Sequence, residues 1–167
     1  LYLLRDSIYK NLRQELKPFV HRVSMRSLSV KEQQRAKQYF DNDVLPLLSP
    51  QVIDIHHPFP HLANKALYVM VRLKTKNREL YGLVPVPQSV DRCYFLSEDQ
   101  RRLVLLEDLI SAHLKELFTG YEIDFHTVIA VTRNADINLN AAEIDDDEDY
   151  REQMKNILKK RRRMAPI

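Results

Sequence analysis

The spacing of apolar residues changes from helical to alternating in the middle of the chain. In "ALYVMVRL", residues 66–73, Leu and Val occupy every second position, and "LYGLVPV", residues 80–86, follows the polar "TKNRE". Two such runs joined by a short polar segment predict a β-hairpin. Pro85 and Pro87 limit the second strand to a sheet edge, or they mark its end.

The first part of the chain has helical spacing instead. Residues 1–17 carry a leucine or isoleucine at every third or fourth position, and Pro18 ends this predicted helix. Ser29 followed by Glu32 is a capping-box pattern, which predicts the start of a second helix over residues 30–45.

The second half of the chain repeats the change from strand to helix to strand. Residues 92–106 predict another hairpin around "SEDQ", and a helix follows from Leu106 to Gly120. In the last predicted strand, residues 121–133, one face is apolar and the other polar. The apolar face comprises Tyr121, Ile123, Phe125, Ile129 and Val131, and the polar face comprises Glu122, Asp124, His126 and Thr132. This order predicts an α+β fold with a mainly antiparallel sheet and flanking helices.

A chain of 167 residues has room for a single domain with a hydrophobic core. We expect a helical part over residues 1–48 and a sheet with further helices over residues 66–163. The chain begins at Leu1 within an amphipathic pattern, which favours a piece of a longer protein. No apolar run reaches the roughly 18 residues that span a bilayer, so we expect a soluble protein with no membrane-spanning segment. The single cysteine fits a reducing cytoplasm.

Glycine and cysteine counts exclude several classes of site. Phosphate-binding loops need several glycines, and this chain has only Gly82 and Gly120. A Walker loop, a kinase-type glycine loop, a dinucleotide fingerprint and a G-x-S-x-G elbow are therefore excluded. The single Cys93 excludes an internal disulfide, a paired-cysteine zinc site and a CxxC redox motif.

Three histidines gather in "HHPFPHLANKALY", residues 56–68. His57 and His61 would share one face of a helix as a metal pair, but the prolines between them prevent that helix. His56 or His57 could carry a phosphoryl group, although no cation stands beside either in sequence. A small metal-dependent hydrolase centred on His56, His57 and His61 is thus a weaker alternative.

A rigid turn explains the same segment better. We expect its histidines to bond to backbone groups while Phe59 and Leu62 anchor the segment in the core. Asn64 would then act as a turn residue before the first strand of the hairpin.

Other polar groups also have structural interpretations. In "TRNAD", residues 132–136, Arg133 could bind a phosphate or carboxylate, but Asn134 and Asp136 suit a tight turn. Glu107 and Asp108 lie in the first turn of a predicted helix, where acidic residues are favourable without any catalytic role.

Charged runs close the chain, with acidic residues at Asp145–Asp149 and basic residues at Lys159–Arg163. In one helix this order complements the helix dipole, worth on the order of 0.3–1 kcal/mol per charge. A solvated helix is therefore favoured over a polyanion contact or a magnesium site. The net charge of +3 does not by itself indicate nucleic-acid binding.

The order of several motifs resembles one known family. "YFDNDVLPLLSPQVIDIHHPFPHLANKALY", then "LEDLISAHLKELFTGYEI", then "VTRNADI" with the acidic helix behind it, is similar to the head, or middle, domain of the long bacterial polyphosphate kinases. The resemblance runs from about residue 1 to 163, and we extend the predicted domain over 1–167.

The resemblance implies an enzyme that reversibly moves the terminal phosphate of ATP onto polyphosphate through a phosphohistidine, using Mg²⁺. In this family those groups lie in other domains, so we assign no catalytic, cofactor-binding or metal-binding residue and expect no ATP or Mg²⁺ on this chain alone. The expected partners are neighbouring domains and a second subunit, with polyphosphate a candidate ligand. The alternative is a module that binds polyphosphate or RNA through Arg133 and Lys159–Arg163.

Overall fold

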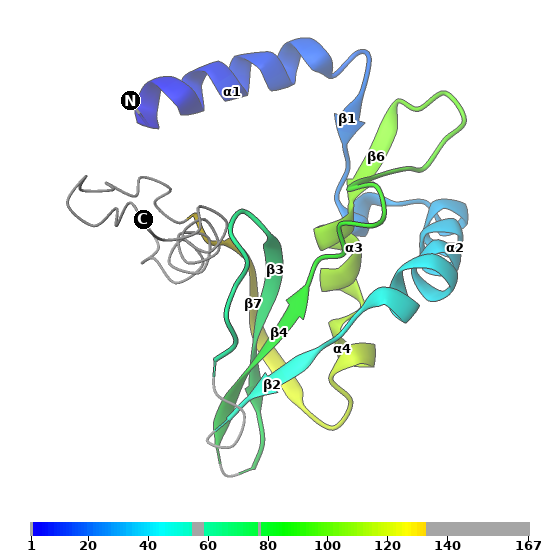
Figure 1. Cartoon of the computed structure of the whole chain (residues 1–167). Helices are drawn as coiled ribbons and strands as arrows, with labels where there is room; N and C mark the ends of the chain where they lie inside the picture. The colour runs from blue at the N-terminus through cyan, green and yellow to red at the C-terminus, as the bar shows by residue number, and fades with distance from the viewer. Residues whose placement is uncertain (1, 55–58, 77, 133–167) are drawn as a thin grey trace, which may run out of the picture.

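The computed structural model describes residues 2–54, 59–76 and 78–132, which form two β-sheets with helices packed beside them (Figure 1). The larger sheet is antiparallel throughout, in the order β2-β4-β3-β7. Its strands are β2 (Gln51–Ile53), β3 (Leu67–Lys74), β4 (Glu79–Pro85) and β7 (Glu122–Ala130). The β3–β4 hairpin confirms the first predicted strand pair. β4 is an interior strand, and Pro85 stands at its end.

The second predicted hairpin belongs to a separate small sheet in the order β1-β6-β5. Its strands are β1 (His21–Arg22), β5 (Cys93–Phe95) and β6 (Arg102–Leu105). β5 and β6 are antiparallel as predicted, whereas β1 lies parallel to β6. The described residues therefore confirm the predicted α+β class, with two sheets where one was expected.

The first two predicted helices are present. They are α1 (Tyr2–Leu16) and α2 (Val30–Tyr39), and α2 continues through a π-turn, η2 (Phe40–Val44), into a 3₁₀ turn, η3 (Leu45–Leu47). Both bonds of the predicted capping box form, because the Ser29 hydroxyl accepts from the Glu32 amide and the Glu32 carboxylate accepts from the Ser29 amide. None of the residues of α1 is buried, and the helix extends away from the two sheets (Figure 1).

The third predicted helix is broken into α3 (Leu106–Ala112) and α4 (Leu114–Leu117). His113 separates them with non-helical dihedral angles, φ −110° and ψ 15°. Its ring stacks on Phe40 with centroids 4.2 Å apart, and Nδ1 lies 2.9 Å from the Leu109 carbonyl oxygen. Packing against η2 therefore accompanies a break that the helical spacing did not predict. No helix in the described ranges is long and apolar enough to cross a membrane.

The larger sheet carries apolar side chains on both faces. Val69, Val71 and Leu73 of β3 point into the main core, which α2, η2, α3 and α4 complete. Tyr68 points to the opposite face, where it packs with Leu83 in a smaller cluster. At Gly82 the backbone of β4 packs directly against the main core. A Cβ at this position would lie 2.6 Å from Val71 and 2.7 Å from the Phe118 ring, so a larger residue does not fit.

A bulge changes the faces of β7. Arg72 of β3 lies opposite Phe125, whereas the next residue, Leu73, lies opposite Ile123. One step along β3 thus corresponds to two steps along β7, and Asp124 is the extra residue. Such an insertion moves the side chains beyond it to the other face of the sheet.

The predicted single apolar face of this last strand is therefore wrong. Tyr121 and Ile123 pack against the main core, while Ile129 and Val131 pack against the cluster on the opposite face. Phe125, next to the bulge, is 55% exposed. Tyr121, Ile123 and Phe125 keep a period of two across the bulge, which gives no sign of the extra residue.

Candidate functional site

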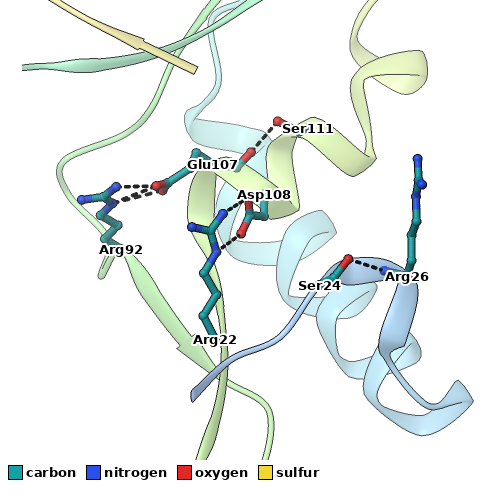
Figure 2. A network of polar contacts seen from close by, with 7 residues as sticks. All are labelled: Arg22, Ser24, Arg26, Arg92, Glu107, Asp108 and Ser111. Carbon is teal, nitrogen blue, oxygen red and sulfur yellow. Dashed lines mark hydrogen bonds and ion pairs between the residues drawn. The ribbon is translucent and has the colours of Figure 1, made fainter. Parts of the chain in front are cut away.

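Polar contacts concentrate around the first turn of α3 (Figure 2). Glu107 and Asp108 project from this turn in different directions, and each binds an arginine from another element. Both acids were predicted to act as partners of the helix dipole. They do lie in the first turn, but their principal contacts are specific ion pairs to residues distant in sequence.

Asp108 binds Arg22 of β1 through two hydrogen bonds. Arg22 Nε donates to Oδ2 at 2.8 Å and Nη2 donates to Oδ1 at 2.6 Å, which is the planar two-point geometry that favours arginine over lysine. The pair joins the small sheet to α3. Because Arg22 is half exposed, the pair fixes geometry more than it adds stability.

Glu107 is buried and binds Arg92, which precedes β5. The Glu107 side chain is only 5% exposed, and its Oε1 accepts hydrogen bonds from Arg92 Nε and Nη2 at 3.0 and 2.5 Å. The hydrogen bonds to Glu107 raise the pKa of Arg92 above its usual value. A buried carboxylate needs such a partner, since desolvation of an unpaired charge is costly.

A 3₁₀ turn, η1 (Met25–Ser27), lies near the Arg22–Asp108 pair (Figure 2). Ser24 caps it, because its hydroxyl oxygen accepts from the Arg26 amide at 3.3 Å. The Arg26 guanidinium points away from that contact (Figure 2), and no described residue forms an ion pair or hydrogen bond with it. Ser111 donates to the Glu107 backbone carbonyl within α3 at 2.6 Å.

These elements border a solvent-open cavity of about 680 Å³. Its walls come from α1, from the segment between β1 and η1, from α3, and from the middle of β7. The polar residues that line it are Arg13, Arg22, Ser24, Arg26, Asp108, Ser111, His126 and Thr127. We call this space the arginine cavity. Its volume lies in the range of small-ligand sites, and its lining contains more positive than negative side chains.

A second charged cluster lies on the larger sheet at the β7 bulge. The Asp124 carboxylate accepts from Arg72 Nε and Nη2 at 2.9 and 2.8 Å, and Lys74 Nζ lies 2.7 Å from it. Hydrogen bonds from Arg72 and Lys74 hold the pKa of Asp124 well below its usual range. This cluster joins the two strands across the bulge.

The histidine motif is only partly described. His56 and His57 lie outside the described residues, and His61 is exposed. Leu62 is buried as predicted, but Phe59 is 53% exposed, so its predicted role as a core anchor is wrong. Residues 64 and 65 form a turn before β3, where Lys65 has a positive φ of 62°.

The remaining predicted polar segments lie outside the described residues, except Thr132, which is exposed. Those segments are Arg133 to Asp136, the acidic run Asp145–Asp149 and the basic run Lys159–Arg163. Within the parts of the chain that the structure describes, no three histidine, cysteine, aspartate or glutamate side chains gather as metal ligands.

Residues 31–167 match the family model described as polyphosphate kinase middle domain. The chain belongs to this family. It is 36% identical over 129 residues to polyphosphate kinase from Bacillus anthracis, covering 72% of this chain and 18% of the relative. It is 30% identical over 160 residues to polyphosphate kinase from Erythrobacter litoralis, covering 95% of this chain and 22% of the relative.

The fold of this polyphosphate kinase middle domain is also similar to a solved one. The crystal structure of polyphosphate kinase from Porphyromonas gingivalis matches 75% of this chain and 22% of its own, with a TM-score of 0.66 and 24% identity. The family identified from the ordered motifs in the sequence is therefore confirmed. The chain spans about a fifth of the length of the relatives named here.

Sequence reasoning missed the arginine cavity. Glu107 and Asp108 were singled out, but Arg22, Arg26 and Arg92 were not, because no local pattern links these arginines to the acids. Arg22 and Asp108 are 86 positions apart. Only the parallel pairing of β1 with β6 brings the two side chains together.

Proposed function

We propose that this chain is the non-catalytic middle domain of an enzyme that reversibly transfers the terminal phosphate of ATP to polyphosphate. The phosphohistidine through which the transfer passes would lie outside this chain. The family match over residues 31–167 carries this proposal. Relatives that bear the name polyphosphate kinase, and of which this chain covers about a fifth, support it.

The contacts around α3 support a structural role for the domain. Arg22 and Arg92 bind Asp108 and Glu107 and so fix the small sheet and the loop before β5 against α3. In each pair the carboxylate accepts two or more hydrogen bonds from the arginine. These carboxylates are therefore engaged in holding the domain together.

The apolar residues of α1 support a role in assembly. Leu4, Ile8, Leu12 and Leu16 recur at intervals of four, so they share one side of the helix, and each is at least half exposed. A helix with an uncovered apolar side is typical of an interaction surface. We propose that this surface packs against a neighbouring domain or a second subunit.

ATP and Mg²⁺ are the groups that the proposed reaction needs. The described residues do not fit a dedicated Mg²⁺ site, because no set of three ligands gathers among them. The chain also contains only two glycines, which is too few for a phosphate-binding loop. No step of the reaction is therefore assigned to these residues.

Phosphate transfer from γ-labelled ATP tests the catalytic part of the proposal. The whole protein that contains this chain should convert ATP into acid-insoluble polyphosphate, and the 167-residue chain alone should not. Polyphosphate synthesis by the chain alone would contradict the non-catalytic assignment. Failure of the whole protein to form polyphosphate would contradict the assigned reaction.

Sedimentation of the whole protein tests the assembly role. The double change Leu4→Lys and Leu12→Lys places charge on the apolar side of α1 and should lower the oligomeric state or expose the neighbouring domain to protease. Gln14→Lys adds the same charge at an exposed polar position of the helix and should change neither. Identical behaviour of the double variant and the unmodified protein would exclude α1 as the contact.

A further inference from the structure

The described walls of the arginine cavity carry more positive charge than their acidic residues neutralise. Among the described residues that line the cavity, Asp108 is the only acidic one, and Arg22 binds it with two hydrogen bonds. Arg13 and Arg26 also line the cavity, and neither guanidinium has a partner among the described residues. Two arginines of the lining therefore have no acidic partner in the part of the chain that the structure describes.

The uncharged polar groups of the cavity add hydrogen-bond donors. The Ser24 hydroxyl accepts from the Arg26 amide, which leaves its own hydrogen free to donate. The Thr127 hydroxyl and the His126 ring lie on the opposite wall. Because β7 is the edge of the described sheet, it also carries backbone N–H groups that no other described strand binds. Arginines with neutral donors are the groups that bind phosphate oxygens.

The residues that line the cavity favour a phosphate chain without bases over a nucleic acid. Proteins that bind single-stranded nucleic acids place aromatic side chains where the bases can stack. The part of the lining that the structure describes contains no phenylalanine, tyrosine or tryptophan, and its apolar residues are Val23, Met25, Ala112 and Val128. Its polar groups suit a ligand whose recognised surface consists of phosphate oxygens.

We propose that the arginine cavity binds an oligophosphate chain. Arg13 from α1 and Arg26 from η1 would bind phosphate oxygens from two sides, while the Arg22–Asp108 pair fixes the wall between them. The prediction of an anion site rests on the cavity itself, and the choice of a linear phosphate chain rests also on the proposed function. The site differs from the polyanion contact considered at Arg133 and Lys159–Arg163.

Calorimetric titration of the 167-residue chain with tripolyphosphate tests the proposal. Arg13→Gln and Arg26→Gln should each weaken binding by about tenfold, because each removes a charge-assisted contact to phosphate. Arg78→Gln is the matched control, since Arg78 is exposed, lies outside the cavity and has no side-chain partner among the described residues. It should leave the affinity within about twofold, the small effect expected of a screened, distant charge.

Several outcomes would overturn the oligophosphate site. They are absence of binding, equal losses in Arg13→Gln, Arg26→Gln and Arg78→Gln, or unchanged affinity in both cavity variants. A single-stranded RNA with the same number of phosphates should bind more weakly than tripolyphosphate, and equal or tighter RNA binding would also contradict the proposal. Circular dichroism and thermal unfolding of each variant separate lost binding from lost folding.

Failure of this site and failure of the proposed function are distinguishable. If the whole protein makes polyphosphate but the cavity variants bind tripolyphosphate normally, only the site is wrong. If the cavity variants lose binding but the whole protein makes no polyphosphate, the site stands and the assigned reaction is wrong.

Discussion

The Arg22 guanidinium donates two parallel hydrogen bonds to the Asp108 carboxylate, at 2.8 and 2.6 Å, across 86 positions of sequence (Figure 2). This pair joins β1 to α3 and lies in the wall of the arginine cavity. The pair positions Arg22, and it neutralises Asp108, the one acidic side chain among the described residues of the cavity lining.

Asp108→Asn should therefore lower the stability of the domain while it strengthens anion binding. Loss of a half-exposed ion pair should lower the free energy of unfolding by about 0.5–1 kcal/mol. Tripolyphosphate should bind severalfold more tightly, because Arg22 loses its counter-charge and the repulsion by Asp108 disappears. Urea unfolding and calorimetric titration measure the two effects. Asp91→Asn, at an exposed position outside the cavity, is the control, and weaker binding by Asp108→Asn would contradict this account.

Arg92→Ala should destabilise the domain more than loss of an ordinary surface arginine. It leaves the Glu107 carboxylate buried without its partner, and removal of one member of a buried pair is costly. Because Arg92 itself is half exposed, we expect about 1–3 kcal/mol, measured by urea unfolding. Arg78→Ala should change stability by less than about 0.5 kcal/mol. Equal effects of the two changes would show that Glu107 does not depend on Arg92.

The two glycines should respond to alanine for different reasons. At Gly82, a Cβ would meet Val71 and the Phe118 ring at under 3 Å, so Gly82→Ala should destabilise by about 1–3 kcal/mol through overpacking. At Gly120 there is open space but φ is +85°, so Gly120→Ala should cost about 1–2 kcal/mol from backbone strain alone.

A second-site change distinguishes these causes. Phe118→Leu removes ring atoms near Gly82 and should reduce the additional cost of Gly82→Ala in a double-mutant cycle. It should leave the cost of Gly120→Ala unchanged. Additive effects for Gly82→Ala and Phe118→Leu would mean that the ring does not restrict residue 82.

The Asp124 cluster should make stability sensitive to acid. Hydrogen bonds from Arg72 and Lys74 lower the pKa of Asp124 in the folded state. A group with a lowered folded pKa contributes its full stability above the unfolded value, about 3.9 for aspartate, and loses it as the pH falls further. Urea midpoints should therefore decline below about pH 4, and Asp124→Asn should make that decline smaller. An unchanged acid dependence in Asp124→Asn would show that other carboxylates cause it.

Local sequence patterns predicted the elements whose causes are local. The capping box at Ser29 and Glu32 forms as expected, and the alternating runs on either side of "TKNRE" become β3 and β4. Pro18 follows the end of α1 closely. Each of these depends on side chains within a few positions, so spacing alone was sufficient.

Elements that depend on distant contacts were predicted less well. His113 interrupts the last helix while its ring stacks on Phe40, some 70 positions away. The bulge at Asp124 moves Phe125 off the core face, although the apolar spacing continues through it. In both places the apolar residues keep the expected spacing, but contacts with residues distant in sequence accompany a different backbone conformation.

The sequence by itself determined the family and the fold class, because ordered motifs and hydrophobic period are properties of the linear chain. It also excluded glycine-loop and paired-cysteine chemistry, which depends on residue counts. Only the tertiary structure decided where the charges meet. Arg13, Arg22 and Arg26 come from the first 26 residues, whereas Asp108 and His126 come from beyond residue 105, and these side chains line one cavity only because β1 pairs with β6 beside α3. Electrostatic fields act through space, so a site built from such separated groups leaves no local pattern in the sequence.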